Sequence, residues 1–240
     1  LEQAKAVANQ ALETAIPAKE WFAGQAGENG AVVETAQELL DAVNAGKETI
    51  VVYGKIDFMH NENITLQENQ KLVGIGYFGD FDSVTDKFSV LNFSADKNMS
   101  AVILGNNTQI SDLTVNYHNS QQNPTANFAT LLISGNKKTI IENIEINYTS
   151  AKSLNSMAQA AILTSSGAES TIRGTVNIRT TGTQVFGIYG MNNAKNHIDG
   201  TINITTKGDM GIGIYTNYSS TTEVSGKINI QTSGIEGYGF

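Results

Sequence analysis

The residues with the spacing of a nucleotide-binding motif are Gly74-Ile-Gly-Tyr-Phe-Gly79. A dinucleotide fingerprint needs a helix that begins directly after the glycines, because the amides at the helix N-terminus hold the pyrophosphate. The segment that follows, 80–86, carries no helical period of apolar residues. The sequence therefore does not predict a nucleotide site.

Three aspartates in that segment could ligate a hard cation. Asp80, Asp82 and Asp86 are close in sequence, and carboxylate oxygens are ligands that Ca²⁺ prefers. Their spacing is not that of an EF-hand loop, so we interpret them as a solvated acidic turn. The histidines stand far apart, without ligand spacing or a nucleophile pattern, at His60, His118 and His197. We predict no metal, no cofactor and no catalytic residue in this chain.

Cationic residues are scarce. The net charge is −8, and the only arginines are Arg173 and Arg179. A partner with a phosphate backbone requires clustered lysine and arginine, so we expect no nucleic-acid partner. No apolar run approaches the roughly 18 residues that a membrane-spanning helix requires, and we expect no membrane insertion by this chain.

A repeat in the last third of the chain determines where its side chains lie. Ile172–Ile178, Ile198–Ile204 and Val224–Ile230 share one pattern, and their glycines recur every 26 residues. A second block keeps the same spacing, at Phe186–Tyr189, Ile212–Tyr215 and Tyr238–Phe240. A fixed period of about 20–50 residues is typical of a solenoid, and alternating β-branched residues between Gly, Asn, Ser and Thr predict strands. One coil cannot bury its own apolar face, so we predict parallel strands stacked coil on coil.

Alternation along a strand assigns the two faces of each coil. The aliphatic residues of the first block form an interior column: Val176, Ile178, Ile202, Ile204, Ile228 and Ile230. The asparagines between them, Asn177, Asn203 and Asn229, form an outward column with a spacing of about 4.8 Å. In the second block the same parity places Phe186, Ile212 and Tyr238 inside with Ile188, Ile214 and Phe240. It leaves Gly187, Gly213 and Gly239 outward, beside Tyr189 and Tyr215.

The outward tyrosines are the best candidates for ligand contact. Tyr189 and Tyr215 beside small glycines would offer a flat aromatic surface, on which the apolar C–H patches of sugars stack. Outward asparagines supply polar partners. We therefore name Tyr189, Tyr215, Asn177 and Asn203 as candidate ligand-binding residues. The alternative is that a loop covers the tyrosines or that they fill a turn.

The whole chain divides into three parts. Residues 1–30 hold a helix over Leu1–Ile16 and an irregular lead-in, in which Trp21 and Phe22 could plug an end of the core. Residues 31–58 hold a capping box, Thr35-Ala-Gln-Glu38, then a short helix and a first strand over Thr49–Tyr53. Residues 59–240 form the coils. Within them, Ile110–Tyr117 and Ile141–Tyr148 match position for position.

The order of these segments resembles a known family. The helix Ala36–Val43, followed by Ile50–Asp57, Asn63–Leu66 and Asn69–Gly76, looks like the start of the pectate-lyase-type right-handed parallel β-helix. The Gly-Ile-Tyr repeats look like passenger domains of large monomeric autotransporters of the fusobacterial adhesin type. The resemblance implies an all-β fold, a right-handed parallel β-helix, or single-stranded solenoid, with an N-terminal helical segment and a capping helix. It also implies secretion across the outer membrane and display at the bacterial cell surface.

An enzyme is the main rival, because many right-handed β-helices cleave polysaccharides. Lyases of this type need a Ca²⁺-binding acidic cluster and an arginine that removes the proton, and hydrolases need paired carboxylates about 5–10 Å apart. The register stacks Arg173 over Asp199 and then Ser225, and an arginine neutralised by an aspartate is a poor base. A second column carries Thr175, Thr201 and Lys227. We see no group of three acids on adjacent coils.

The interpretation is therefore a non-catalytic adhesin passenger that attaches to other cells through loops and the solenoid face. Its expected partner is a host-cell or bacterial surface glycan or protein. A polysaccharide lyase or hydrolase and a purely structural stalk remain the alternatives. We expect a monomer, because each coil can enclose its own apolar column, and we expect the natural solenoid to continue beyond Phe240.

Overall fold

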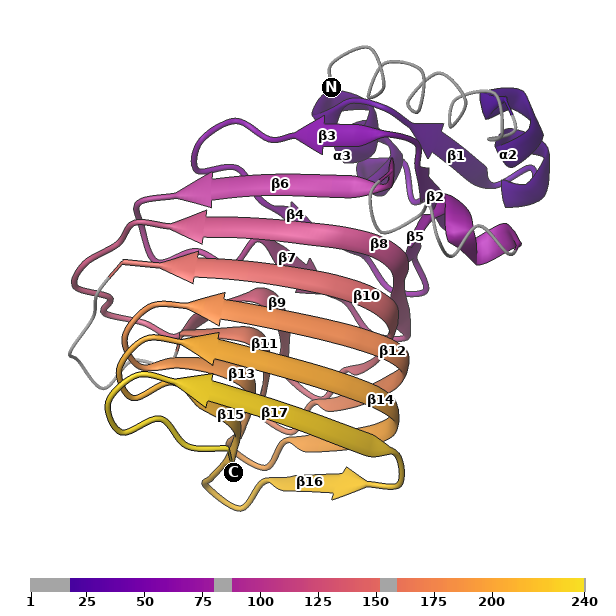
Figure 1. Cartoon of the computed structure of the whole chain (residues 1–240). Helices are drawn as coiled ribbons and strands as arrows, with labels where there is room; N and C mark the ends of the chain where they lie inside the picture. Colours follow the sequence, from indigo (N-terminus) through magenta and orange to yellow (C-terminus); the bar gives the residue numbers. More distant parts are fainter. Residues whose placement is uncertain (1–17, 80–87, 152–158, 240) are drawn as a thin grey trace, which may run out of the picture.

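Alternating apolar residues fold the chain into parallel strands that stack coil upon coil (Figure 1). The computed structural model describes residues 18–79, 88–151 and 159–239. Its strands form an 11-stranded sheet, here the large sheet, and a 6-stranded sheet, here the small sheet. Neighbouring strands pair in parallel in both sheets. The predicted all-β, parallel solenoid is confirmed.

The large sheet contains β1 (Gly30–Val33), β2 (Thr49–Val52), β3 (Lys55–Asp57), β5 (Lys71–Gly74), β6 (Val90–Ala95), β8 (Thr108–Asn119), β10 (Lys138–Ser150), β12 (Glu169–Thr181), β14 (Lys195–Lys207), β16 (Thr221–Val224) and β17 (Lys227–Ser233). The small sheet contains β4 (Ile64–Thr65), β7 (Val102–Leu104), β9 (Phe128–Ser134), β11 (Gln159–Ser165), β13 (Val185–Met191) and β15 (Ile212–Thr216). The helices are α2 (Lys19–Ala26), α3 (Ala36–Asn44) and the 3-10 helix η1 (Ile75–Phe78).

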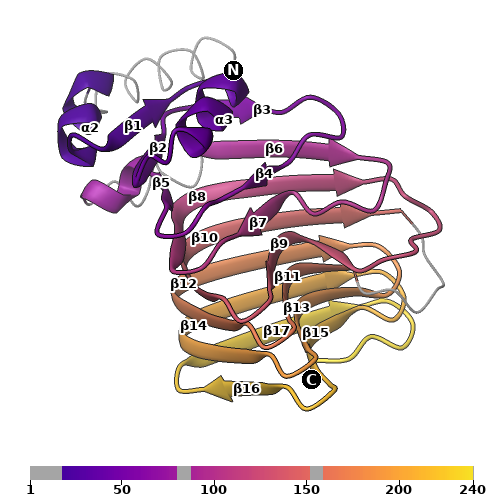
Figure 2. The ribbon, with the colours of Figure 1, turned by 180° about the vertical axis from the view of Figure 1, so that it is seen from behind.

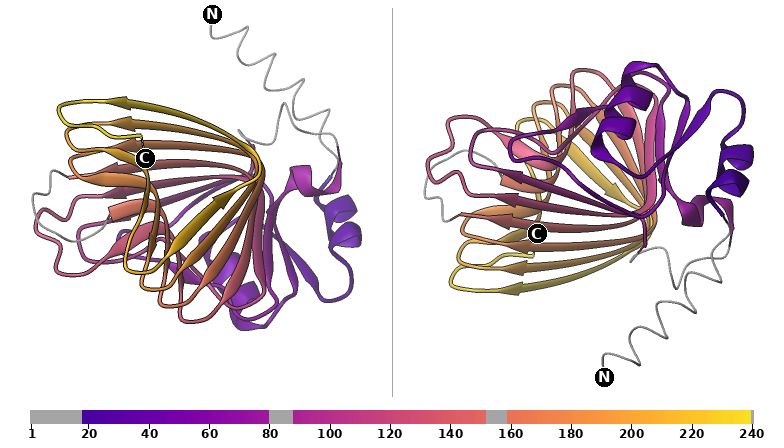
Figure 3. Two further views of the ribbon diagram at one scale, coloured as in Figure 1. Left: turned by 90° about the horizontal axis from the view of Figure 1, so that it is seen from below. Right: turned by 90° about the horizontal axis from the view of Figure 1, so that it is seen from above.

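The long strands of the large sheet turn through one corner, which is visible when the stack is viewed along its axis (Figure 3). Asp112, Asn143 and Gly174 occupy this corner with φ of 57°, 46° and 67°. Asparagine, aspartate and glycine are the residues that adopt this left-handed backbone most easily. On β14 the corner separates the part that pairs with β16 from the part that pairs with β17.

The predicted register of the first repeat block is confirmed. Ile172 pairs with Ile198, Gly174 with Gly200 and Ile178 with Ile204. The aliphatic column is interior: Val176, Ile178, Ile202 and Ile204 are buried, and the last coil adds the partly buried Ile228 and Ile230. The continuous core therefore comes from aliphatic side chains that stack at matching positions between coils, as a period of 26 residues requires.

The middle coils follow the same rule with a longer period. Ile110 pairs with Ile141 and Tyr117 with Tyr148, as the match between the two segments predicts. The tyrosine rings stack inside the core, with centroids 5.5 Å apart. Each buried hydroxyl has a partner, because Tyr117 donates to the carbonyl of Met99 and Tyr148 donates to Gln159 Oε1 at 3.2 Å.

In the small sheet the predicted faces are partly wrong. Ile188 and Ile214 are interior as predicted, but Phe186 packs in an outer cluster with Tyr189. Gly187 and Gly213 face inward instead. A Cβ on Gly187 would lie 2.7 Å from Cγ2 of the core residue Ile204. Gly187 and Ile188 thus point inward in succession, which strict alternation cannot describe.

The same error in the predicted faces applies to two other members of the second block. Ile212 pairs with Phe186 on β13 and is only partly buried, and Tyr238 bridges to Ile212 and is 56% exposed. Neither is the core residue that parity predicted. Phe240 lies outside the described residues.

At the N-terminal end, Phe22 of α2 is fully buried, but not in the main core. It packs with Val51 and Val73, which alternate with core residues on β2 and β5, and with Ile75 of η1. Trp21 is 41% exposed. The prediction that both aromatic residues plug an end of the core is therefore wrong, because α2 lies beside the sheet. The expected helix over Leu1–Ile16 lies outside the described residues.

Half of the predicted capping box before α3 forms, because the Glu38 side chain bonds to the amide of Glu34 and not to that of the N-cap residue Thr35. The Thr35 side chain accepts a hydrogen bond from the Glu38 amide at 3.2 Å, and Glu38 Oε2 accepts one from the Glu34 amide at 2.8 Å. Leu39, Ala42 and Val43 belong to the main core cluster. Seen from behind, α3 lies at the end of the stack where the first coils begin (Figure 2).

Candidate functional site

An aromatic cluster lies on the outer face of the small sheet. Tyr189 on β13 and Tyr215 on β15 are register partners, and their ring centroids are 5.3 Å apart. Phe186 stacks on Tyr189 at 4.8 Å and on Tyr215 at 5.5 Å. The column of tyrosines predicted from the repeat therefore exists. The sequence interpretation missed its third member, Phe186, because parity placed that residue inside.

The members of this outer aromatic cluster differ in how much of each ring reaches solvent. Tyr189 is only 6% exposed, whereas Tyr215 is 38% exposed and nearby Tyr218 is 67% exposed. Burial raises the pKa of the Tyr189 hydroxyl, and a hydrogen bond from Asn217 opposes that shift. Tyr189 therefore supports the cluster from beneath, and Tyr215 and Tyr218 present the accessible aromatic surface.

The predicted asparagines lie elsewhere. Asn177 and Asn203 are on the outer face of the large sheet, where Asn203 Nδ2 donates to Asn177 Oδ1 at 2.9 Å and Asn229 Nδ2 donates to Asn203 Oδ1 at 2.7 Å. The structure thus brings together the two tyrosines and, separately, the two asparagines. It does not bring all four candidate residues into one site.

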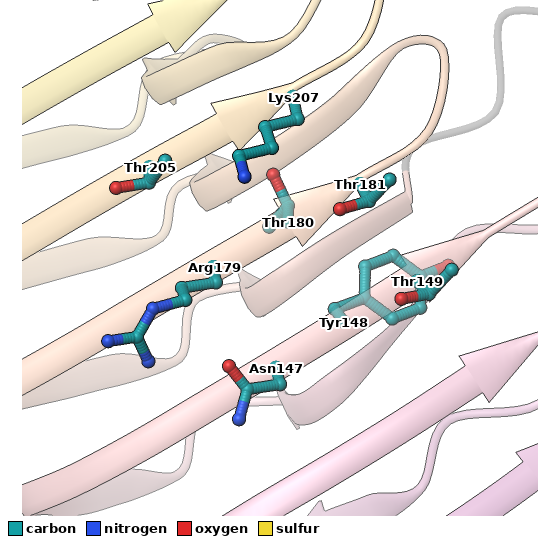
Figure 4. Close-up of a pocket in the computed structure, with 8 residues that line it drawn as sticks. All are labelled: Asn147, Tyr148, Thr149, Arg179, Thr180, Thr181, Thr205 and Lys207. Carbon is teal, nitrogen blue, oxygen red and sulfur yellow. The ribbon is translucent and has the colours of Figure 1, made fainter.

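Beside this asparagine ladder the outer face of the large sheet is hollowed into a groove of about 300 Å³. Three neighbouring strands, β10, β12 and β14, supply its lining near their C-terminal ends (Figure 4). The lining residues are Asn147, Tyr148, Thr149, Arg179, Thr180, Thr181, Thr205 and Lys207. We call this hollow the polar groove.

The charges of the polar groove are unequal. Arg179 Nη1 lies 2.5 Å from Glu145 Oε1, which also accepts a hydrogen bond from Asn147 Nδ2 at 3.0 Å. Lys207 forms no ion pair with any residue that the structure describes. One cation of the groove is therefore balanced by a carboxylate, and the other faces solvent alone.

A second hollow of about 320 Å³ lies toward the opposite ends of β10 and β12. Here Lys138 pairs with Glu169 at 3.3 Å, and this hydrogen bond holds the pKa of the Glu169 carboxyl below its usual range. His197 adds a contact of 3.1 Å from its Nε2 to Glu169 and one of 3.0 Å from its Nδ1 to Glu223. The charged groups of this hollow thus satisfy one another across four strands.

The other residues considered for chemistry have structural contacts. The arginine register is confirmed, since Arg173 pairs with Asp199, but its guanidinium bonds to Glu142 on the preceding coil at 2.8 Å. The expected Arg–Asp ion pair is therefore wrong. His60 lies 3.4 Å from Asp96.

The remaining motifs have the following outcomes. After β5 the glycine motif continues as the four-residue η1. Asp80, Asp82 and Asp86 lie outside the described residues. Within the described ranges, no group of three or more His, Cys, Asp or Glu side chains is placed to hold a metal ion. Among the described helices, none is long and apolar enough to cross a membrane.

A scan of the chain against models of protein families finds no match, and a search of curated proteins finds none either. The features that bear on function are therefore the parallel solenoid, its outer faces and the residues that carry the sequence resemblance.

Proposed function

We propose that this chain is a non-catalytic, ligand-binding part of a bacterial surface adhesin. The observation that carries the proposal is the aromatic cluster of Phe186, Tyr189 and Tyr215 on the outside of the solenoid. Three stacked rings on an outer face do not contribute to the interior column that holds the coils together. Aromatic side chains with a polar tip are the groups that binding surfaces use most.

The proposed ligand is a glycan on a host or bacterial cell. A sugar ring presents an apolar C–H face that packs flat on an aromatic ring, and its hydroxyl groups need polar partners at the edge. Tyr215 and Tyr218 offer accessible rings with hydroxyl tips, and the buried Tyr189 holds Tyr215 in place. A surface protein is the other class of partner, and it would use the same exposed rings as anchors.

The finer architecture belongs to the same proposal. We infer a right-handed coil, and we infer that α3 caps the first coil, because Leu39, Ala42 and Val43 pack onto the main core at that end. Export across the outer membrane and display at the cell surface are supported by the resemblance of residues 172–240 to autotransporter passengers. A monomeric state is supported by the way each coil encloses its own apolar column.

The contacts of the outward glutamates favour binding over polysaccharide cleavage. Glu142 bonds to Arg173, Glu145 to Arg179 and Glu169 to Lys138. A carboxylate held by a cation is stabilised in its charged form and is a weak general acid. These ion pairs between coils instead connect β10 to β12, which is a structural role.

The experiment is a glycan array probed with the chain and with Tyr215→Ala. We expect wild-type binding to a subset of glycans that Tyr215→Ala reduces at least tenfold. The matched control is Tyr77→Ala, because Tyr77 is 37% exposed and Tyr215 38%, and Tyr77 lies on η1 at the other end of the stack. Melting curves of both variants check that the fold persists.

The outcomes separate the rivals. An array profile that Tyr215→Ala and Tyr77→Ala leave equally unchanged contradicts the aromatic site. A wild-type chain that binds no glycan and no cell surface favours the structural stalk. Release of unsaturated ends from acidic polysaccharides would identify a lyase.

A further inference from the structure

We propose that the polar groove on the large sheet is a second binding site, which takes the anionic group of an acidic sugar residue, a carboxylate or a sulfate ester. It lies on a different sheet from the aromatic cluster, and its residues are separate. The inference therefore does not depend on the glycan proposed for Tyr215.

The groove has the dimensions of a sugar. Two rows cross its strands in register: Asn147, Arg179 and Thr205 form one, and Thr149, Thr181 and Lys207 form the other. Parallel strands lie about 4.8 Å apart, so each row spans about 10 Å. The hollow of about 300 Å³ between the side chains falls at the small end of the range for ligand pockets.

The net charge of the groove suits a ligand group with one negative charge. Arg179 and Lys207 are the cations, and Glu145 is the carboxylate that contacts Arg179. A guanidinium has five N–H donors, and the contact with Glu145 through Nη1 leaves others free. Lys207 adds three donors at the end of a flexible side chain, and its ammonium group has no carboxylate partner among the described residues. One uncompensated cation beside a partly used guanidinium suits a monoanion.

The remaining lining matches the polyhydroxylated part of such a ligand. Thr149, Thr181 and Thr205 face outward along the groove, in alternation with the buried residues of their strands. Each hydroxyl can both donate and accept a hydrogen bond, as sugar hydroxyls do. A free phosphate or sulfate would use the two cations but not these three hydroxyls.

The hollow at the other end of the same strands provides an internal comparison. It has a similar volume, about 320 Å³, but Lys138 there is bonded to Glu169 and His197 contacts Glu169 and Glu223. Its cation is already occupied. The net charge of −8 on the whole chain does not cancel the local positive charge of Lys207, because electrostatic attraction at physiological ionic strength acts over only about 8 Å.

The test is an NMR titration of the isotope-labelled 240-residue chain. The probes are a uronic-acid oligosaccharide, a sulfated oligosaccharide, a neutral glucose oligosaccharide and inorganic sulfate. We expect an acidic oligosaccharide to shift the amide signals of Asn147, Thr181 and Thr205, and the neutral one to leave them unchanged. Lys207→Gln should weaken this binding at least tenfold.

The control variant is Lys195→Gln, an exposed lysine on the same strand β14 at its opposite end. It should leave the affinity unchanged, and Tyr215→Ala should also leave it unchanged, which separates this site from the aromatic one. Equal losses in Lys207→Gln and Lys195→Gln would show only non-specific charge attraction and would overturn the site. Groove signals that no acidic saccharide moves, or that inorganic sulfate moves at equal affinity, would overturn the assignment to an acidic sugar.

Discussion

The outer faces of the two sheets share the same coil repeat, but the side chains that stack on them differ in how much they leave exposed to a partner. On the large sheet, identical polar residues bond to one another along the stack, as Asn229, Asn203 and Asn177 do. A second ladder runs from Asn147 through Asn116 and Asn92 to Asp57. On the small sheet, Phe186, Tyr189 and Tyr215 stack but leave rings exposed. A ladder that satisfies its own hydrogen bonds stabilises the coils, whereas exposed rings, and a lysine with no ion pair among the described residues, Lys207, are available to a partner.

The largest expected effect is the difference in stability between a substitution on the inner face of the large sheet and one on its outer face. Ile204→Asp places an unpaired charge in the core, where Ile204 is 1% exposed, and should lower the free energy of unfolding by about 3–5 kcal/mol. Asn203→Asp keeps the acceptor that Asn229 uses but loses the donor to Asn177, which should cost about 1 kcal/mol. Denaturant unfolding measures both. Equal midpoints for the two variants would refute the register.

The interior tyrosines predict a loss of stability at high pH. Burial raises the pKa of the Tyr117 hydroxyl from 10.0 to about 12, and burial also raises that of Tyr148. Above pH 10 the unfolded chain loses these protons while the folded chain retains them, so stability is full below pH 10 and falls between about pH 10 and 12. Tyr117 alone should account for about 2–3 kcal/mol. Unfolding at several pH values tests this, and Tyr117→Phe should flatten the dependence; an equally steep loss in that variant would contradict it.

A smaller effect should show which way the glycines of the small sheet face. A Cβ on Gly187 would lie 2.5 Å from the Gly213 carbonyl oxygen and 2.7 Å from Ile204, so Gly187→Ala should destabilise the chain by about 1–3 kcal/mol. Gly24→Ala in α2 is the control, since nothing lies within 4 Å of its Cβ and alanine favours helix. If Gly187→Ala melts like Gly24→Ala, the glycine faces outward, as strict alternation would have it.

Sequence reasoning succeeded where one period controls the structure. The pairing of Gly174 with Gly200 and the buried Ile202 and Ile204 follow from the spacing of 26 residues and from alternation. It failed at Phe186 and Gly187, because Gly187 and Ile188 point inward in succession and break alternation without leaving a sequence signal. It also assigned Arg173 the wrong partner, because its register partner on the preceding coil, Glu142, stands 31 residues away and falls outside the 26-residue period.

The candidate site could be predicted only in part. Tyr189 and Tyr215 were found because they repeat with the coil. The polar groove was missed, although the same spacing aligns Thr181 with Lys207. The spacing does not show which cation has a carboxylate partner. Arg179 contacts Glu145, and Lys207 has no such partner among the described residues. Pairing across coils of different length depends on the bulge at the corner, and no single period describes it.

The most direct test of the aromatic site is an NMR map of a neutral glycan selected on the array, titrated into the labelled chain. We expect the signals of Phe186, Tyr189 and Tyr215 on the small sheet to shift in proportion to occupancy, while those of the ladder of Asn177, Asn203 and Asn229 stay unchanged. Shifts confined to the asparagine ladder, with β13 and β15 unaffected, would contradict it.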